Sequence, residues 1–258
     1  MNDDAPVPDY TLRQVPALRP LHWLQSGWQD FMGHPGPSLM YGLLVTLAGW
    51  AIVTLAAPHA ELFTSVVSGF VLIAPLIAAG IYELTRQREA GEPASFINSV
   101  KSLKRNASSI ADFGVVLVLA GILWERVAAV MFALSYGGDM GSVTDFVSDV
   151  FFSGNYWGVV IAWLLSGAVL ASVVFSITVI GMPMVIDRNA DVVTAMITSV
   201  KAVFLNLPAM AVWALIIVGL TGLGMALALV GLVVVMPLLG HATWCAYKDL
   251  VVPIELND

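Results

Sequence analysis

The sequence is poor in charge. Asp, Glu, Lys and Arg make up only 11% of its 258 residues, whereas an average soluble domain carries about 25%. Hydrophobic residues account for 59% of the chain, and the mean hydropathy is +0.86. Because so few charges cannot cover a water-facing surface, we expect lipid to surround most of the chain. The composition therefore excludes a soluble globular enzyme and a disordered regulator.

Cysteine and positive charge are also scarce. Cys245 is the only cysteine, which excludes an internal disulfide and a thiolate metal cluster. The formal net charge of −7 argues against nucleic acid as a partner. No Walker, G-x-S-x-G or H-E-x-x-H pattern occurs in a usable context. We therefore expect no enzymatic activity.

Histidine is placed wrongly for haem. Haem ligation in a helix bundle needs histidines between facing spans. All four histidines lie before, between or near the ends of the predicted spans: His22, His34, His59 and His241. We therefore expect no cofactor and no metal site.

Long uncharged runs locate the membrane-spanning segments. A spanning helix needs about 20 apolar residues, and the run 202–247 is more than twice that length, so it must fold back. We place this turn at the glycine cluster Gly219–Gly224. The sequence predicts an all-α, polytopic membrane protein with six transmembrane helices in three hairpins, at about 38–57, 62–82, 113–135, 157–182, 207–220 and 223–247.

Lys and Arg fix the predicted orientation. Ten of the eleven basic residues lie before the first span, after spans two and four, or after span six. The positive-inside rule places these segments, and therefore both termini, in the cytoplasm. We divide the chain into a flexible cytoplasmic tail at 1–20, a single membrane domain at 21–250 and a C-terminal tail at 251–258.

The chain contains an internal repeat. Residues 97–101 and 197–201 read INSVK and ITSVK, and Asn106 and Asn206 each follow five residues later. A weaker third copy places His34-Pro35 at the asparagine position. Each unit combines an amphipathic interfacial helix with an outward and a return span, and prolines 75, 183 and 237 lie near the cytoplasmic ends of the return spans. The units cover about 21–82, 95–186 and 191–250.

Several of these motifs resemble those of one known family. They are Trp28 with His34-Pro35 and Tyr41-Gly42; Gly69-Phe70, Ala74-Pro75-Leu76 and 80–84; Asp187-Arg188 with 194–196; and, most specific, 237–244. The chain resembles, after about Arg19, the uncharacterised bacterial integral-membrane proteins grouped as domain of unknown function 2189. The resemblance implies a bacterial inner (plasma) membrane location and no established activity.

Two charged residues interrupt the third predicted span. A charge at the centre of a bilayer costs at least about 2.5 kcal/mol on insertion scales. Because adjacent helical residues diverge by about 100°, we expect Glu125 and Arg126 to turn into the bundle toward separate partners. Two interpretations stay open, a structural hydrogen-bond network and a polar functional site.

Four further candidates lie on the predicted cytoplasmic face: His34, Asp187, Arg188 and His241. Nearby, Asp191 is placed to cap the helix that follows it. We expect a non-catalytic accessory or scaffolding subunit in contact with the lipid bilayer that binds lipid or another membrane protein. The alternative is a small-solute or ion translocator built from the tandem hairpins, because repeats are typical of transporters.

Overall fold

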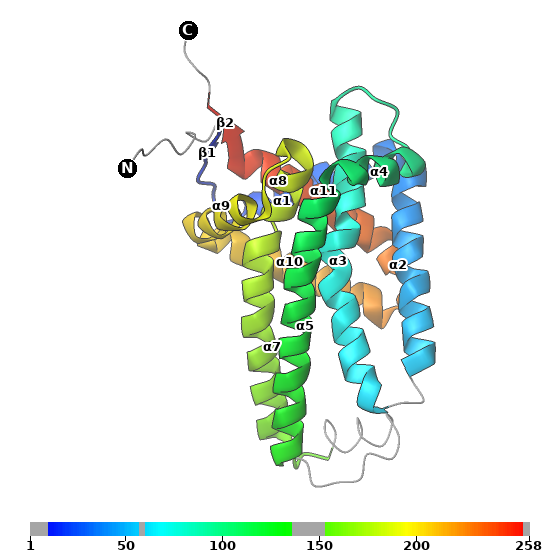
Figure 1. The fold of residues 1–258 in the computed structure, drawn as a ribbon, viewed down its shortest axis with the longest axis vertical. Coiled ribbons are helices and arrows are strands. Elements are labelled where there is room, and N and C mark those ends of the chain that lie inside the picture. Colours follow the sequence, from blue (N-terminus) through cyan, green and yellow to red (C-terminus); the bar gives the residue numbers. More distant parts are fainter. Residues whose placement is uncertain (1–9, 57–59, 136–152, 255–258) are drawn as a thin grey trace.

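The protein is almost entirely helical, as the sequence predicts. The computed structural model describes residues 10–56, 60–135 and 153–254 (Figure 1). Its elements are β1 (Tyr10–Leu12), α1 (Arg19–Gly33), α2 (Pro35–Ala56), α3 (Ala60–Glu89), α4 (Phe96–Ser102), a 3-10 turn (Leu103–Asn106), α5 (Ala107–Ser135), α7 (Trp157–Thr178), α8 (Gly181–Arg188), α9 (Val192–Leu205), α10 (Leu207–Ala226), α11 (Leu232–Leu250) and β2 (Val251–Pro253).

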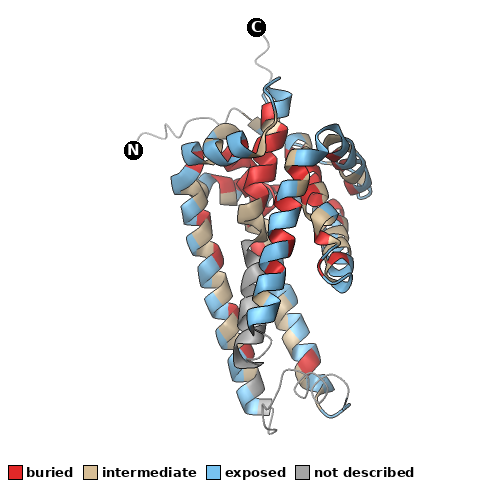
Figure 2. Ribbon diagram, turned by 90° about the vertical axis from the view of Figure 1, so that its right-hand side faces the viewer, coloured by how far each residue is buried: buried red, intermediate tan, exposed pale blue. Residues whose placement is uncertain are grey.

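Four long helices stand side by side. α2, α3, α5 and α7 pack in chain order (Figure 1). Among the described residues, four segments are long and apolar enough to cross a membrane: 35–55, 96–131, 157–188 and 207–226. α3 and α11 occupy the places of the second and sixth predicted spans but are not among these four. Buried residues gather at the end that carries β1 and β2, here called the sheet end (Figure 2).

The turn between the last two long helices differs from the prediction. α10 runs through Gly219 and Gly222 and ends at Ala226. The turn follows at 227–231, where Ala228 and Leu229 adopt positive φ. Backbone groups in lipid stay paired within the helix, so glycine does not end a helix there as readily as in water. Gly224 serves instead for close packing, since a Cβ there would lie 2.9 Å from the Leu232 side chain.

The return span predicted at 157–182 is two helices. α7 ends at Thr178, and α8 begins at Gly181. At this break the Ile180 amide donates a hydrogen bond to the Ser199 hydroxyl, at 3.1 Å. A side chain of the next repeat unit therefore satisfies a backbone group that the interrupted helix leaves open.

The two predicted tails meet in a small sheet. β1 pairs antiparallel with β2, and Tyr10 lies opposite Pro253. The flexible tail predicted at 1–20 and the C-terminal tail predicted at 251–258 therefore differ from the structure over these strands. Apolar packing explains the difference, because Val251 is buried and Tyr10 and Leu12 pack against the core. Residues 1–9 and 255–258 lie outside the described residues.

Each predicted interfacial segment is helical. α4 with its 3-10 turn covers 96–106 and α9 covers 192–205, as the repeat predicts, and α1 takes the same place in the first unit. α4 and α9 lie across the ends of the long helices (Figure 1). α1 packs on α11, α4 packs on α3, and α9 packs on α7 and α8. Each short helix thus contacts the return helix of another unit, and the contact between the first and third units closes a ring.

Small residues make these contacts possible. Gly27, Ser99 and Ser199 stand at one repeat position, seven residues before His34, Asn106 and Asn206. A Cβ on Gly27 would lie 2.5 Å from the Ala242 nitrogen. The Ser99 hydroxyl bonds the Tyr41 hydroxyl at 2.8 Å, and Ser199 receives the Ile180 amide. The repeat therefore preserves, from one unit to the next, the close approach of each short helix to its neighbour.

Candidate functional site

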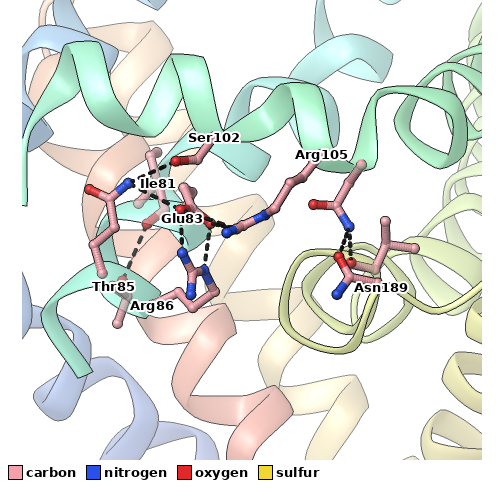
Figure 3. Close-up of polar contacts among 10 residues, drawn as sticks. Ile81, Glu83, Thr85, Arg86, Ser102, Arg105 and Asn189 are labelled. Carbon is pink, nitrogen blue, oxygen red and sulfur yellow. Dashed lines mark hydrogen bonds and ion pairs between the residues drawn. The ribbon is translucent and has the colours of Figure 1, made fainter. Parts of the chain in front are cut away.

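A buried carboxylate organises the sheet end. Glu83 of α3 is only 1% exposed. Arg86 donates to it through Nε and Nη2, both at 2.7 Å. Gln87 Nε2 donates at 3.0 Å and Arg105 Nη2 at 3.2 Å (Figure 3). Because Arg105 belongs to the turn before α5, this network joins the first repeat unit to the second.

The surroundings of Glu83 favour its charged form. Burial alone would raise its pKa, but the hydrogen bonds from Arg86 and Gln87 and the charges of Arg86 and Arg105 outweigh burial. The pKa of Glu83 therefore lies below its ordinary value of 4.5. A buried charge that is fully paired in this way holds the helix ends in one arrangement.

The two repeat asparagines tie helix starts to other segments. Asn106 Nδ2 donates to the Val185 carbonyl oxygen at 2.7 Å and to Asn189 Oδ1 at 2.9 Å (Figure 3). Asn206 Oδ1 accepts from the Val15 amide at 2.8 Å, and its Nδ2 donates to the Arg13 carbonyl oxygen at 3.0 Å. Their shared position before an outward helix thus has one structural role, which is to anchor that helix at its first turn.

The predicted histidine candidates share one serine. His241 is 3% exposed, and its ring bonds Thr85 Oγ1 at 2.6 Å and Ser38 Oγ at 2.9 Å. Ser38 Oγ also donates a hydrogen bond to the backbone oxygen of His34, at 3.1 Å. His34 itself is exposed. The structure therefore brings His34 and His241 near each other, with the His241 imidazole held by two hydroxyl groups between α2, α3 and α11.

Asp187 and Arg188 meet at a different side chain. The Tyr247 hydroxyl donates to Asp187 Oδ2 at 2.8 Å and accepts from Arg188 Nε at 3.1 Å. Lys248 Nζ lies 3.4 Å from the same Asp187 oxygen. The candidates on this face thus form two groups, and each group fastens α11 to another helix.

Asp191 caps α9 as predicted. Its carboxylate accepts a hydrogen bond from the Thr194 amide at 2.9 Å. Hydrogen bonds from the Thr194 side chain and, next, from the Thr194 amide hold the pKa of the exposed Asp191 carboxyl below its ordinary value. Within the described ranges, no three His, Cys, Asp or Glu side chains converge as metal ligands would.

Glu125 and Arg126 do not behave as expected. Arg126 Nε lies 3.3 Å from Glu125 Oε2. The Arg126 side chain is 76% exposed and the Glu125 side chain is 36% exposed. The prediction of separate partners inside the bundle is therefore wrong. The two Cα–Cβ bonds diverge, but the long arginine side chain reaches back to the neighbouring carboxylate. The pair lies on the outer surface of α5.

Sequence reasoning missed two anchoring carboxylates. Asp249 accepts from Arg19 Nε at 2.7 Å and from Trp23 Nε1 at 2.8 Å, and it also pairs with Arg13. Glu83 belongs to a family motif, but the motif by itself does not mark it as a site. A usable signal is present, because an acid at the end of a long apolar run with arginine three residues later forms an i,i+3 pair.

The fold and its polar ends define a multi-helix integral membrane protein. A family model described as predicted integral membrane protein (DUF2189) matches residues 62–187. Over these residues the chain is similar to that family, as its motifs predict. Neither a curated protein nor a solved structure matches the chain.

Proposed function

We propose that the protein is a non-catalytic accessory subunit of the bacterial inner membrane that binds another membrane protein through the outer face of α5. In this proposal six helices cross the bilayer and both termini face the cytoplasm, with the sheet end on the cytoplasmic side. The basic residues of that end support the orientation. The anchoring role of the sheet-end side chains supports a structural rather than a catalytic function.

The exposed ion pair on α5 carries the proposal. Arg126 lies about 20 Å along the helix from residue 113, at about 1.5 Å per residue, in a hydrocarbon core about 30 Å thick. Ile122 and Leu123, one turn before Arg126, and Leu119, two turns before it, are exposed apolar side chains. A charge that faces acyl chains costs at least about 2.5 kcal/mol at the helix centre, and Arg126 lies only about 5 Å beyond the middle of the core.

The Arg126 side chain also points away from the nearer membrane–water interface. Helical side chains lean toward the N-terminus of their helix. In the proposed orientation the α5 N-terminus is cytoplasmic, so Arg126 leans away from the nearer, outer interface. A protein surface with polar groups relieves the cost that lipid does not, which favours a protein partner over lipid alone.

Translocation is the second candidate, and it has less support. Among the described residues, the buried hydrogen-bonded side chains that define the site gather at the sheet end, around Glu83 and His241. A pathway would need polar lining along the spans as well. This alternative stays untested.

The orientation is tested with alkaline phosphatase fusions. The enzyme is active only outside the cytoplasm, so a fusion after Asp145 is expected to be active and a fusion after Gly91 inactive. The reverse pattern would overturn the orientation and with it the argument on Arg126.

The binding surface is tested by photo-crosslinking in membranes. A benzophenone amino acid replaces Ile122 on α5, and the control replaces Leu215 on α10, which is also exposed and apolar. We expect a protein adduct at 122 and none at 215. Only lipid adducts at position 122 would refute the proposed function.

A further inference from the structure

We propose that the partner bound at the outer face of α5 is a second copy of this chain, held by reciprocal ion pairs between Glu125 of each copy and Arg126 of the other. This inference rests on the proposed function and names its partner. The complex is a parallel dimer whose two-fold axis is normal to the membrane.

The exposed face of α5 has the pattern of a helix-pairing stripe. Exposed residues recur at alternating spacings of four and three: Val115, Leu119, Ile122, Arg126, Ala129 and Ala133. This heptad spacing keeps one seam facing a partner helix along its whole length. The two alanines lie in the half of the stripe that follows Arg126, where small side chains let membrane helices approach closely.

The charges of this stripe complement themselves. Glu125 precedes Arg126 directly, so Arg126 holds a central seam position and Glu125 flanks it. In a parallel pair, the flanking position of one helix faces the central position of the other. Each guanidinium therefore meets the other copy's carboxylate. An acid and a base in equal number make a patch that matches its own copy without any third group.

Membrane topology brings the two copies into register. Both copies insert with the same orientation, so a two-fold axis along the membrane normal places identical residues at identical depth. Glu125 and Arg126 differ in position along the helix axis by only about 1.5 Å. The carboxylate of one copy and the guanidinium of the other therefore lie at nearly the same depth in the membrane. A helix of another protein would need its own acid and base at this depth.

Complementary variants test the reciprocal pairs. Glu125→Gln removes the carboxylates and Arg126→Gln removes the guanidinium groups, and both changes nearly preserve size. Two differently tagged copies are co-expressed, and copurification in mild detergent is measured. We expect each variant to copurify with itself about tenfold less than wild type does, which corresponds to about 1.4 kcal/mol. The mixed pair of Glu125→Gln with Arg126→Gln keeps one ion pair and is expected to copurify better than either variant with itself. Equal copurification of all combinations would overturn the proposal.

Cysteine crosslinking tests the seam without changing the charges. In a Cys245→Ser background, Ile122→Cys places a thiol on the seam and Leu215→Cys on α10 is the exposed control. Oxidation in membranes is expected to give a band of twice the monomer mass for Ile122→Cys only. If Ile122→Cys stays monomeric while the benzophenone at 122 captures a different protein, the second copy is refuted and the proposed function stands. If neither reagent yields a protein adduct, both are refuted.

Discussion

Replacing Gly27 by alanine tests the contact that closes the ring. The new Cβ would lie 2.5 Å from the nitrogen, 2.7 Å from Cα and 2.7 Å from Cβ of Ala242. Backbone atoms cannot rotate away, so α1 and α11 must separate by about 1 Å to restore ordinary contact. Overpacking of this kind costs about 1–3 kcal/mol, while alanine in place of glycine within a helix returns about 0.5–1 kcal/mol. The two terms leave a net loss of at most about 2.5 kcal/mol. Because the clash is with backbone atoms, we expect about 1–2 kcal/mol, which lowers the ratio of folded to unfolded protein about 5- to 30-fold.

The assay is unfolding in a titration with sodium dodecyl sulfate, followed by tryptophan fluorescence. Trp23 of α1 is buried edge-on against Trp213 of α10, with ring centroids 6.0 Å apart, so it reports the release of α1. Gly222→Ala is the matched control, because Gly222 lies inside α10 and a Cβ added there would meet no atom within 4 Å. We expect the control to unfold no earlier than wild type. If Gly27→Ala unfolds together with the control, the close approach does not contribute to stability and the reasoning is wrong.

Two further substitutions test the sheet end. Glu83→Gln is expected to lower the free energy of unfolding at pH 7 by about 1.5–3 kcal/mol, the contribution of hydrogen bonds to a charged group. Because the pKa of Glu83 is lowered in the folded state, its charge stabilises the fold above pH 4.5, and this contribution is lost as the pH falls through the folded-state pKa. In chemical unfolding, the difference in stability between Glu83→Gln and wild type should therefore shrink below about pH 4.5. A difference that stays constant with pH would contradict the assigned charge. Asp191→Ala removes the cap of α9 and should cost about 1 kcal/mol in the same titration, whereas Asp191→Asn, which keeps an acceptor, should cost less, and equal losses would argue against the cap.

Local signals explain which parts of the fold follow from the sequence. The short helices before Asn106 and Asn206 and the cap at Asp191 depend on residues only a few positions apart, so pattern and spacing predict them. Length and composition likewise predict that long apolar helices dominate the chain. These are the elements for which the structure confirms the prediction.

Contacts between distant residues explain the rest. α10 continues past the glycines at 219–224 to Ala226, and Gly224 packs closely against Leu232 of α11, a contact that the glycine count does not reveal. Glu83 becomes an anchor only because Arg105, on another unit, reaches it. The direction of Arg126 depends on which face of α5 the other long helices cover, and periodicity alone does not reveal this when a helix is apolar all round.

Closure of the ring sets an order on synthesis. α1 leaves the ribosome before α11, and its binding surface on α11 is translated only after the other long helices. Until then Trp23 and Phe31, which are buried in the finished protein, have no partner on α11. A chain truncated before Gly240 would leave this apolar side of α1 open to proteases and chaperones. The contact between α1 and α11 therefore forms only in chains that extend through α11.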